Sequence, residues 1–455
     1  MATNYNYFGN LVTNGLVLDL DAAKLASYPG SGTTWRDISG NGNNGTLTNG
    51  PTFSGVSKQA NFLFDNTDDY VVISSSATIT PRTGDFTSDF WINPTAWTSG
   101  NYQPIQVTAL TSGLWIGQNA SNQFIVRAYG VADRLQYATR PATGSWSNVS
   151  ITRNSNLINL YYNGTPVTSS ISNQDFVQGT TYLGSDAPGG GGAVYFNGRI
   201  ASSKYYNKGL SQFEVWQNFN AIKGRYGIPD IVTNGLVLNL DAGNPYSYLS
   251  GSSGTTWTNV APISSSISGT LTNGPVYANG AISFDGVDDE CNLGNVLFNS
   301  ASATTIDLWV NIPNMSVNRY IMAKGSAGDG IYTFICTTGL GPSGGGSSYI
   351  RFAMGNQSGT VSSNIEYSSL NWNQWYNFTF TYDGSFVRGY QNATLPQSSS
   401  LSGNLYTTTT PIYLGRSKYG NFAPSSISNF KIYNRALSAT EITQNFNALR
   451  GRYGI

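Results

Sequence analysis

LVTNGLVLDLDA, at residues 11–22, returns as IVTNGLVLNLDA at residues 231–242. In the first copy Leu16, Leu18 and Leu20 alternate with one apolar and one acidic residue. Alternation with a period of two is typical of a β-strand. A strand of this kind needs a sheet beside it, because a lone strand leaves its apolar faces in water. We therefore expect each copy to begin a β-domain.

Further segments repeat along the rest of the chain. The pairs are SGTTW at 31–35 and 253–257, GTLTNGP at 45–51 and 269–275, and FDNTDD and FDGVDD at 64–69 and 284–289. The sequence therefore predicts two tandem domains, residues 11–228 and 231–455, after a short arm at residues 1–10. Only Pro229 and Asp230 separate the repeats, so we expect a restricted mutual orientation. The arm either docks on a neighbouring molecule or is a loose terminus.

The composition limits the classes of partner. Of 455 residues 39% are apolar and only 10% are charged, with Lys plus Arg and Asp plus Glu balanced at 23 each. Zero formal charge argues against nucleic acid or an anionic membrane held by bulk electrostatics. No apolar run approaches the length that a membrane-spanning helix needs, so membrane insertion is not expected.

Turn and cap signals give the fold class. Asn163-Gly164 and Asp383-Gly384 each separate two alternating runs, which predicts antiparallel hairpins and a sandwich. Each repeat then ends in a Ser-x-x-Glu capping box followed by apolar residues at helical spacing, which predicts a short C-terminal helix. The capping boxes are Ser211 with Glu214, and Ser438 with Glu441. The predicted fold is all-β, with two tandem β-sandwiches that each end in a short α-helix.

Tryptophans and cysteines give candidates for the core. Six tryptophans recur in both repeats and are expected to be buried: Trp35, Trp91, Trp146, Trp257, Trp309 and Trp375. The two cysteines, Cys291 and Cys336, lie in apolar strand patterns and are interpreted as buried hydrophobic residues. A disulfide between them is the alternative, and it requires their Cα atoms to lie within about 7 Å.

The repeated segments, from GLVLDLDA and SGTTW through FDxxDDYV to the closing FNGRI and YNKGLS, resemble concanavalin A-like/laminin-G-type domains. They are most similar to the domains of bacteriophage virion structural proteins, marine phages in particular. The resemblance covers nearly the whole chain. It implies concanavalin A-like jelly-roll sandwiches of about a dozen strands, with glycan binding at a rim or on a concave face and sometimes calcium. It also implies a role on capsids, tails or fibres.

Catalytic machinery is sparse. The chain contains no histidine, which removes Ser-His-Asp and Cys-His nucleophiles and His-ligated metals. Glycoside hydrolysis needs only two carboxylates. The four glutamates are Glu214, Glu290, Glu366 and Glu441, and two of these belong to capping boxes. Glu290 stands where the first repeat has Tyr70. We expect no enzymatic activity and no required cofactor.

Two acidic clusters have the residue types of a calcium site. They are Asp65, Asp68 and Asp69 in the first repeat, and Asp285, Asp288 and Asp289 in the second. Calcium binds six to eight oxygens, and such a turn could supply part of that shell. The alternative is that these carboxylates accept hydrogen bonds from turn amides. Asp21 and Asp241, at the end of the opening strands, have the same two interpretations.

Four aromatic residues in polar loops are the candidates for glycan contact: Trp97, Tyr102, Tyr419 and Phe422. Aromatic faces pack on sugar C–H groups while nearby polar groups bind hydroxyls. The alternatives for each are a plug over the edge of the core or an anchor in a protein interface.

Together these observations predict a non-enzymatic virion structural protein, a capsid decoration or a tail or fibre component, that displays two lectin-like domains and attaches weakly to cell-surface glycans. Other virion proteins and further copies of this chain are the expected protein partners. The first ten residues do not read as a secretory signal, which favours the virion surface as the location. The alternatives are a carbohydrate-binding adhesin outside a virus, or a polysaccharide-degrading enzyme.

Overall fold

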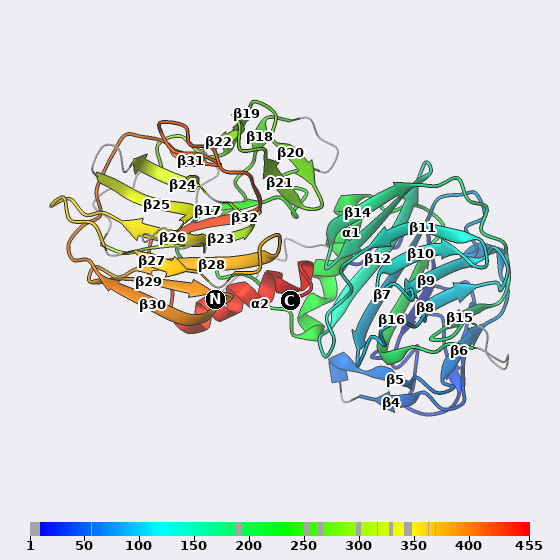
Figure 1. Ribbon diagram of the computed structural model, residues 1–455. Coiled ribbons are helices and arrows are strands. Elements are labelled where there is room, and N and C mark those ends of the chain that lie inside the picture. Colours follow the sequence, from blue (N-terminus) through cyan, green and yellow to red (C-terminus); the bar gives the residue numbers. More distant parts are fainter. Residues whose placement is uncertain are drawn as a thin grey trace. The chain divides into compact units, whose positions relative to one another are not determined.

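The computed structural model describes residues 10–55, 57–186, 193–249, 254–262, 267–296, 302–315, 317–326, 331–340, 348–362, 364–368 and 370–455 (Figure 1). Nine of the ten residues of the predicted arm, 1–9, lie outside this set. Two compact units emerge: residues up to Pro229 together with Leu449–Ile455, and Asp230–Ala448. Among the described residues, no helix is long and apolar enough to cross a membrane.

Each domain is a sandwich of two antiparallel sheets, and within the described residues each of the four sheets has eight strands. The prediction of tandem all-β sandwiches is confirmed. The expected dozen strands per domain was too low, because short strands such as β2 (Thr34–Trp35) pair at the sheet edges. Two-residue strands lack enough alternation to be recognised in sequence.

The first sheet follows the order β14-β13-β12-β7-β16-β5-β4, and β1 also pairs with β16. Its strands are β1 (Leu16–Asp21), β4 (Thr52–Ser54), β5 (Asn61–Asp65), β7 (Phe86–Pro94), β12 (Ser147–Asn154), β13 (Leu157–Tyr162), β14 (Thr165–Ile171) and β16 (Asn197–Tyr206).

The second sheet follows the order β11-β10-β9-β8-β15-β6-β3-β2. Its other strands are β3 (Gly45–Thr48), β6 (Tyr70–Ile73), β8 (Gln103–Thr108), β9 (Leu114–Gln118), β10 (Phe124–Ala128), β11 (Ala132–Tyr137) and β15 (Thr181–Leu183).

The third sheet, in the second domain, follows β20-β21-β32-β23-β28-β29-β30, with β17 paired to β32. Its strands are β17 (Leu236–Asp241), β20 (Val276–Ala278), β21 (Ala281–Phe284), β23 (Thr304–Asn311), β28 (Trp375–Tyr382), β29 (Phe386–Gln391), β30 (Thr394–Ser400) and β32 (Ser425–Tyr433).

The fourth sheet follows β18-β19-β22-β31-β24-β25-β26-β27. Its strands are β18 (Thr256–Trp257), β19 (Gly269–Thr272), β22 (Glu290–Asn292), β24 (Arg319–Ser326), β25 (Ile331–Leu340), β26 (Ser348–Met354), β27 (Ile365–Tyr367) and β31 (Ile412–Leu414). The two domains therefore share one strand order, and the register is set by the same alternation in both.

The core of each domain lies between its two sheets. In the first domain Leu18 and Leu20 of β1 pack in it, as the opening alternation predicted. Trp35 and Trp257 are fully buried in the two cores. Cys291 and Cys336 are both buried and free, so the interpretation as small hydrophobic residues holds.

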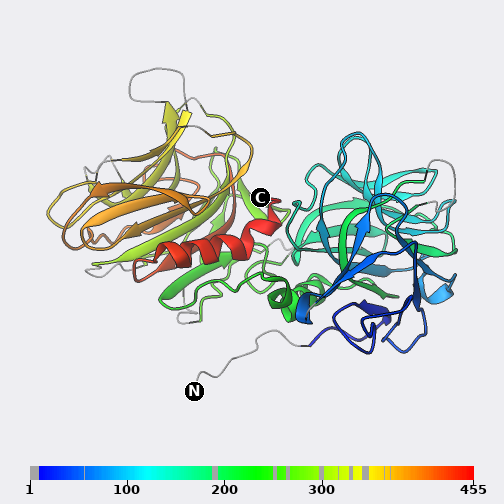
Figure 2. The same cartoon turned by 90° about the horizontal axis from the view of Figure 1, so that it is seen from below.

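The outer faces of the first and third sheets are covered by the C-terminal helices α1 (Gln212–Ile222) and α2 (Ala439–Leu449). Figure 2 shows α2, in red, lying along the strands of its domain. The capping boxes form as predicted: Ser211 Oγ accepts from the Glu214 amide at 3.4 Å, and Ser438 Oγ accepts from the Glu441 amide at 3.3 Å. Short 3-10 helices lie at Ser57–Gln59, Ala77–Ile79, Lys223–Tyr226 and Arg450–Arg452.

The helices explain where the remaining tryptophans lie. Trp91 and Trp309 are fully buried, but on the outer sheet faces, where Trp91 stacks on Tyr226 at 4.0 Å and Trp309 on Phe446 at 5.6 Å. Trp146 and Trp375 are only half-buried, so their assignment to the core was wrong. Each stands at or just before the start of a strand, and Trp146 packs beside Tyr226 with 5.0 Å between the ring centres.

Candidate functional site

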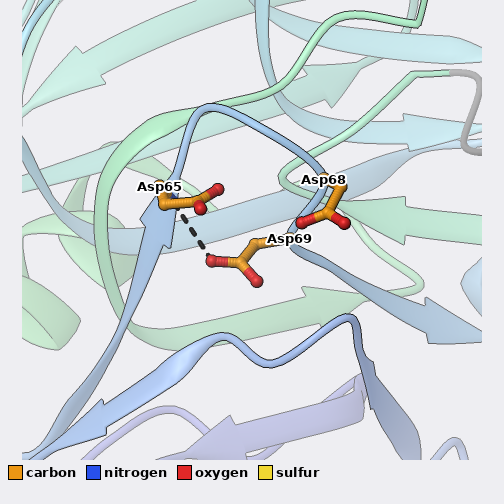
Figure 3. A group of neighbouring side chains, drawn as sticks. All are labelled: Asp65, Asp68 and Asp69. Atoms are coloured by element: carbon orange, nitrogen blue, oxygen red, sulfur yellow. Dashed lines mark hydrogen bonds between the residues drawn. The ribbon is translucent and has the colours of Figure 1, made fainter.

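The first acidic cluster forms the turn between β5 and β6 (Figure 3). Asp65 ends β5, and its amide donates to Oδ2 of Asp69 at 3.1 Å. Oδ1 of Asp65 accepts from the amide of Thr67 at 2.8 Å. One carboxylate oxygen from each of Asp65, Asp68 and Asp69 lies within 4.8 Å of the other two. Asp65 and Asp68 are exposed, whereas Asp69 is buried.

The second cluster repeats this geometry in the turn between β21 and β22. The amide of Asp285 donates to Oδ2 of Asp289 at 2.9 Å, and Oδ1 of Asp285 accepts from the amide of Val287 at 2.8 Å. Asp288 completes a group whose oxygens also lie within 4.8 Å of one another. The same turn is thus built twice from different intervening residues.

Burial, neighbouring charges and hydrogen bonds shift the pKa values of the aspartates in these clusters. Desolvation, with the neighbouring carboxylate of Asp65, raises the pKa of Asp69 to about 6. Burial likewise raises the pKa of Asp289. Hydrogen bonds from turn amides, that of Val287 foremost, lower the pKa of the exposed Asp285. A buried carboxylate beside a second one therefore gains more from a bound proton or cation than an exposed aspartate does.

The turn-amide hydrogen bonds expected of structural anchors are present in both clusters. Each carboxylate keeps further lone pairs, so the three side chains could also supply part of a calcium shell. Asp21, the other acidic candidate, forms a two-pronged ion pair with Arg225 at 2.7 Å, and its Oδ1 also accepts from the amide of Ala23. Asp241 accepts from the amide of Gly243 at 3.0 Å.

The two aromatic candidates of the first domain lie in the loop between β7 and β8. Trp97 is half-buried against Phe196, with its Nε1 donating to the Pro141 carbonyl at 2.8 Å, as a plug over the core edge would. Tyr102 is 36% exposed and meets Trp115 edge-on at 5.8 Å. The Arg127 guanidinium lies 5.1 Å from the centre of the Tyr102 ring.

This aromatic loop touches the first acidic turn. Gln103, next to Tyr102, donates from Nε2 to Oδ1 of Asn66, inside the turn, at 3.4 Å. Its Oε1 accepts from the amide of Thr98 at 2.8 Å, which ties the middle of the loop to the start of β8. The structure therefore brings the acidic turn and the aromatic loop, predicted separately, to one rim of the first sandwich.

The second domain has a rim of the same kind, made by the loop at residues 415–424 that follows β31. Tyr419 is 59% exposed, whereas Phe422 is half-buried and pairs with Tyr320 at the start of β24. The loop packs on the second acidic turn: a Cβ built on Gly286 would lie 2.4 Å from Cδ of Pro424. Both predicted residue sets again meet at one end of the sandwich.

Three further residues of this second rim are missing from the predicted sites. Glu290, at the start of β22, forms an ion pair with Arg416 in the loop. The Arg416 guanidinium stacks on Tyr413 with 4.3 Å to the ring centre, and lies 5.6 Å from the ring of Phe422. The available signal was a difference between the repeats, since the positions of Glu290 and Arg416 are occupied by other residues in the first domain.

The sequences of both domains match one known family. The family model for the concanavalin A-like lectin/glucanases superfamily matches residues 65–216 and 285–443, which together are more than half of the chain. The chain belongs to this superfamily. Each match begins at the first aspartate of an acidic turn and ends inside the C-terminal helix. The superfamily domains are thus present in two tandem copies.

Solved structures resemble this superfamily member only weakly. Domain 4 of AbnA, a GH43 extracellular arabinanase from Geobacillus stearothermophilus in complex with arabinotriose, is 15% identical with a TM-score of 0.34, over 45% of this chain and 97% of that one. The binding domain of Paraclostridial Mosquitocidal Protein 1 is 14% identical with a TM-score of 0.40, over 89% and 99%. Similarities this low do not assign a ligand. No curated protein matches the sequence.

Proposed function

We propose that the protein is a non-enzymatic carbohydrate-binding protein whose two lectin-like domains each bind glycan at the rim. The observation that carries the proposal is the meeting of an acidic turn with an aromatic loop in both domains, through Gln103 and Asn66 in the first and Gly286 and Pro424 in the second. Carboxylates and amides bind sugar hydroxyls, while exposed ring faces pack on C–H groups.

The ion pairs of the glutamates argue against a glycosidase that uses them as its catalytic carboxylates. All four glutamates form ion pairs: Glu214 with Lys208, Glu290 with Arg416, Glu366 with Arg351, and Glu441 with Arg435. Glycoside hydrolysis requires one carboxylic acid to be kept protonated opposite a second carboxylate. Against desolvation, hydrogen bonds from the partner cations and the capping serines lower the pKa of Glu214 and hold that of Glu441 at about 2, so these two are poor candidates for the acid. Glu290 and Glu366 are each engaged by an arginine.

The setting that we propose is the surface of a bacteriophage particle, on the capsid or in a tail or fibre. It rests on the resemblance of both repeats to the domains of phage virion structural proteins. A balanced, weakly charged surface is compatible with contacts to other virion proteins and with weak attachment to cell-surface glycans. An adhesin acting outside a virus would use the same rims and is the alternative outcome.

Binding of the full chain to a glycan array, with and without a chelator, tests the first part. We expect glycan signals with micromolar to millimolar affinity. Loss of signal on chelation would assign calcium to the acidic turns, and retention would assign these turns a purely structural role. A complete absence of binding would contradict the proposal.

Immunogold labelling of purified phage particles tests the setting. We expect label on the particle surface, at the head or along the tail. Unlabelled particles, alongside labelled controls for a known surface protein, would contradict the virion proposal while leaving glycan binding untouched.

A further inference from the structure

We infer that the second domain carries a sugar subsite that the first domain lacks, built on Glu290, Tyr413 and Arg416, and that its ligand is a neutral sugar with neighbouring hydroxyls. The inference rests on the proposed glycan binding and specifies it. Four observations support it: the strand register, the immobilised arginine, the balance of charge at the rim and the difference between the repeats.

Strand register places the subsite on the outer face of the fourth sheet. Cys291 faces Leu414 across β22 and β31, and both belong to the core. Asn292 faces Tyr413 in the next pair, so these two side chains point away from the core. Glu290 lies two residues before Asn292 and therefore shares the outer face with Tyr413. The two groups flank the loop that carries Arg416.

Arg416 is held in place, yet its outer edge remains available. Its Nε faces Glu290, and its plane lies over Tyr413 and near Phe422. Its side chain is 21% exposed. A guanidinium fixed by an ion pair and ring stacking loses less entropy when it binds than a free surface arginine does. The exposed part of this side chain is thus held in a fixed plane.

The charge around this plane favours a neutral ligand. Carboxylates outnumber cations at this rim. The acidic turn of Asp285, Asp288 and Asp289 runs directly into Glu290, whereas the loop contributes two cations, Arg416 and Lys418. A sugar carboxylate or sulfate at Arg416 would meet the field of these groups. Sugar hydroxyls, which donate as well as accept, can pair with a carboxylate and a guanidinium at once.

An aromatic face for the sugar ring lies in the same loop. Tyr419 is three residues beyond Arg416 and is 59% exposed, and the Lys418 ammonium lies 5.1 Å from the centre of its ring. The turn that carries it is closed by Ser417, whose amide donates to the Gly420 carbonyl at 2.8 Å. Polar groups on the sheet and an exposed ring on the loop are the two components that a sugar site combines.

The first domain shows what the same scaffold looks like without this subsite. Its equivalents of Glu290 and Arg416 are Tyr70 and Ser185. There Tyr70 meets Tyr182, the equivalent of Tyr413, edge-on at 6.2 Å. Both charged members of the pair are therefore exchanged together, and the fold accommodates either combination.

The double variant E290Y/R416S of the full chain, which installs the first domain's residues, tests the inference. Neutral oligosaccharides that the wild-type array identifies are titrated calorimetrically. We expect affinity at the second domain to fall about tenfold or more, since hydrogen bonds to charged groups are lost. The matched control is E366Y/R351S, which removes another Arg–Glu pair of the fourth sheet, between β26 and β27. We expect it to bind as the wild type does.

Arg416→Lys covers the case in which the double variant does not fold, because lysine keeps the charge and loses the fork and the stacking. It should also weaken binding. Unchanged affinity in a folded E290Y/R416S or R416K protein would overturn the inference while glycan binding stands. Tighter binding of sialylated or sulfated sugars than of neutral ones would overturn the ligand class. A wild-type protein that binds no glycan would overturn both proposals.

Discussion

The ammonium of Lys431 lies 2.9 Å from Oδ1 of Asp307, and both side chains are fully buried. The two residues face each other on β32 and β23, under the side of the third sheet that α2 covers. The other oxygen of Asp307 accepts from Thr379 Oγ1 at 2.8 Å. In the first domain Lys204 lies opposite Asp89 in the same strands, but its ammonium forms an ion pair with Asp19 of β1, at 3.4 Å. A buried lysine–aspartate pair is thus present in each domain, with a different aspartate as the partner.

Breaking the Lys431–Asp307 ion pair should destabilise the second domain. We expect Lys431→Met to lower the free energy of unfolding by about 3–5 kcal/mol, because it leaves the Asp307 carboxylate buried without a cation. Denaturant unfolding measures the change. The double variant K431M/D307N, which keeps a polar partner for Thr379 without a charge, should recover part of the loss. Equal instability of the single and double variants would contradict this account.

The capping box of α2 should contribute a smaller, local amount. Ser438→Ala removes the acceptor for the Glu441 amide, and we expect a loss of about 1 kcal/mol. Thr440→Ala, an exposed change in the same helix turn, is the matched control and should leave stability nearly unchanged. Thermal unfolding of the two variants makes the comparison, and similar melting temperatures would argue against a contribution of the cap.

Asp69 should give the protein a characteristic pH dependence. Its pKa rises from 3.8 to about 6 in the fold through desolvation and the nearby Asp65. Between these values the folded state holds more protons than the unfolded state, so this group's contribution to stability is present at low pH and is lost as pH rises toward 6.

Unfolding free energies of the wild type and Asp69→Asn between pH 4 and pH 7 test the sign, and we expect the variant to lose this slope. An unchanged slope would contradict the assignment. The same series in millimolar calcium separates the two interpretations of the acidic turn, since a bound cation would keep Asp69 ionised and remove the loss.

Gly415 should be more sensitive to substitution than Gly420 in the same loop of the second rim. Its φ is +87°, and a Cβ there would lie 2.8 Å from Cδ1 of Phe284. Gly420, with a φ of +86°, would place a Cβ 3.5 Å from the nearest atom, in Phe422. Both changes to alanine strain the backbone, but only Gly415→Ala adds a clash with the core, which costs about 1–3 kcal/mol more. Denaturant unfolding compares the two, and equal losses would refute the role of the clash.

The fold could largely be predicted from local signals. Alternation identified the opening strands, the Asn-Gly and Asp-Gly turns identified hairpins, and the Ser-x-x-Glu boxes identified both helices. The buried Lys431 escaped, because a charged residue in an alternating strand indicates a solvent-facing position. It is buried only because α2, from a later part of the sequence, covers that face of the sheet.

The candidate sites were predicted as separate pieces. The acidic turns and the aromatic loops are each visible as local composition, but their contact depends on distant segments, as in the bond from Gln103 to Asn66. Glu290 was visible as a departure from Tyr70. Arg416 likewise departs from Ser185, but its pairing with Glu290 could not be read from the sequence, because that pair forms only once β22 lies beside β31.

The identical strand order of the two domains makes the molecule its own internal standard. Any titration of the full chain records one sandwich with the Glu290–Arg416 pair and one with Tyr70 and Ser185, at equal concentration and in the same buffer. A chemical-shift or fluorescence response confined to one copy therefore points to residues that differ between the repeats, the Glu290–Arg416 pair among them.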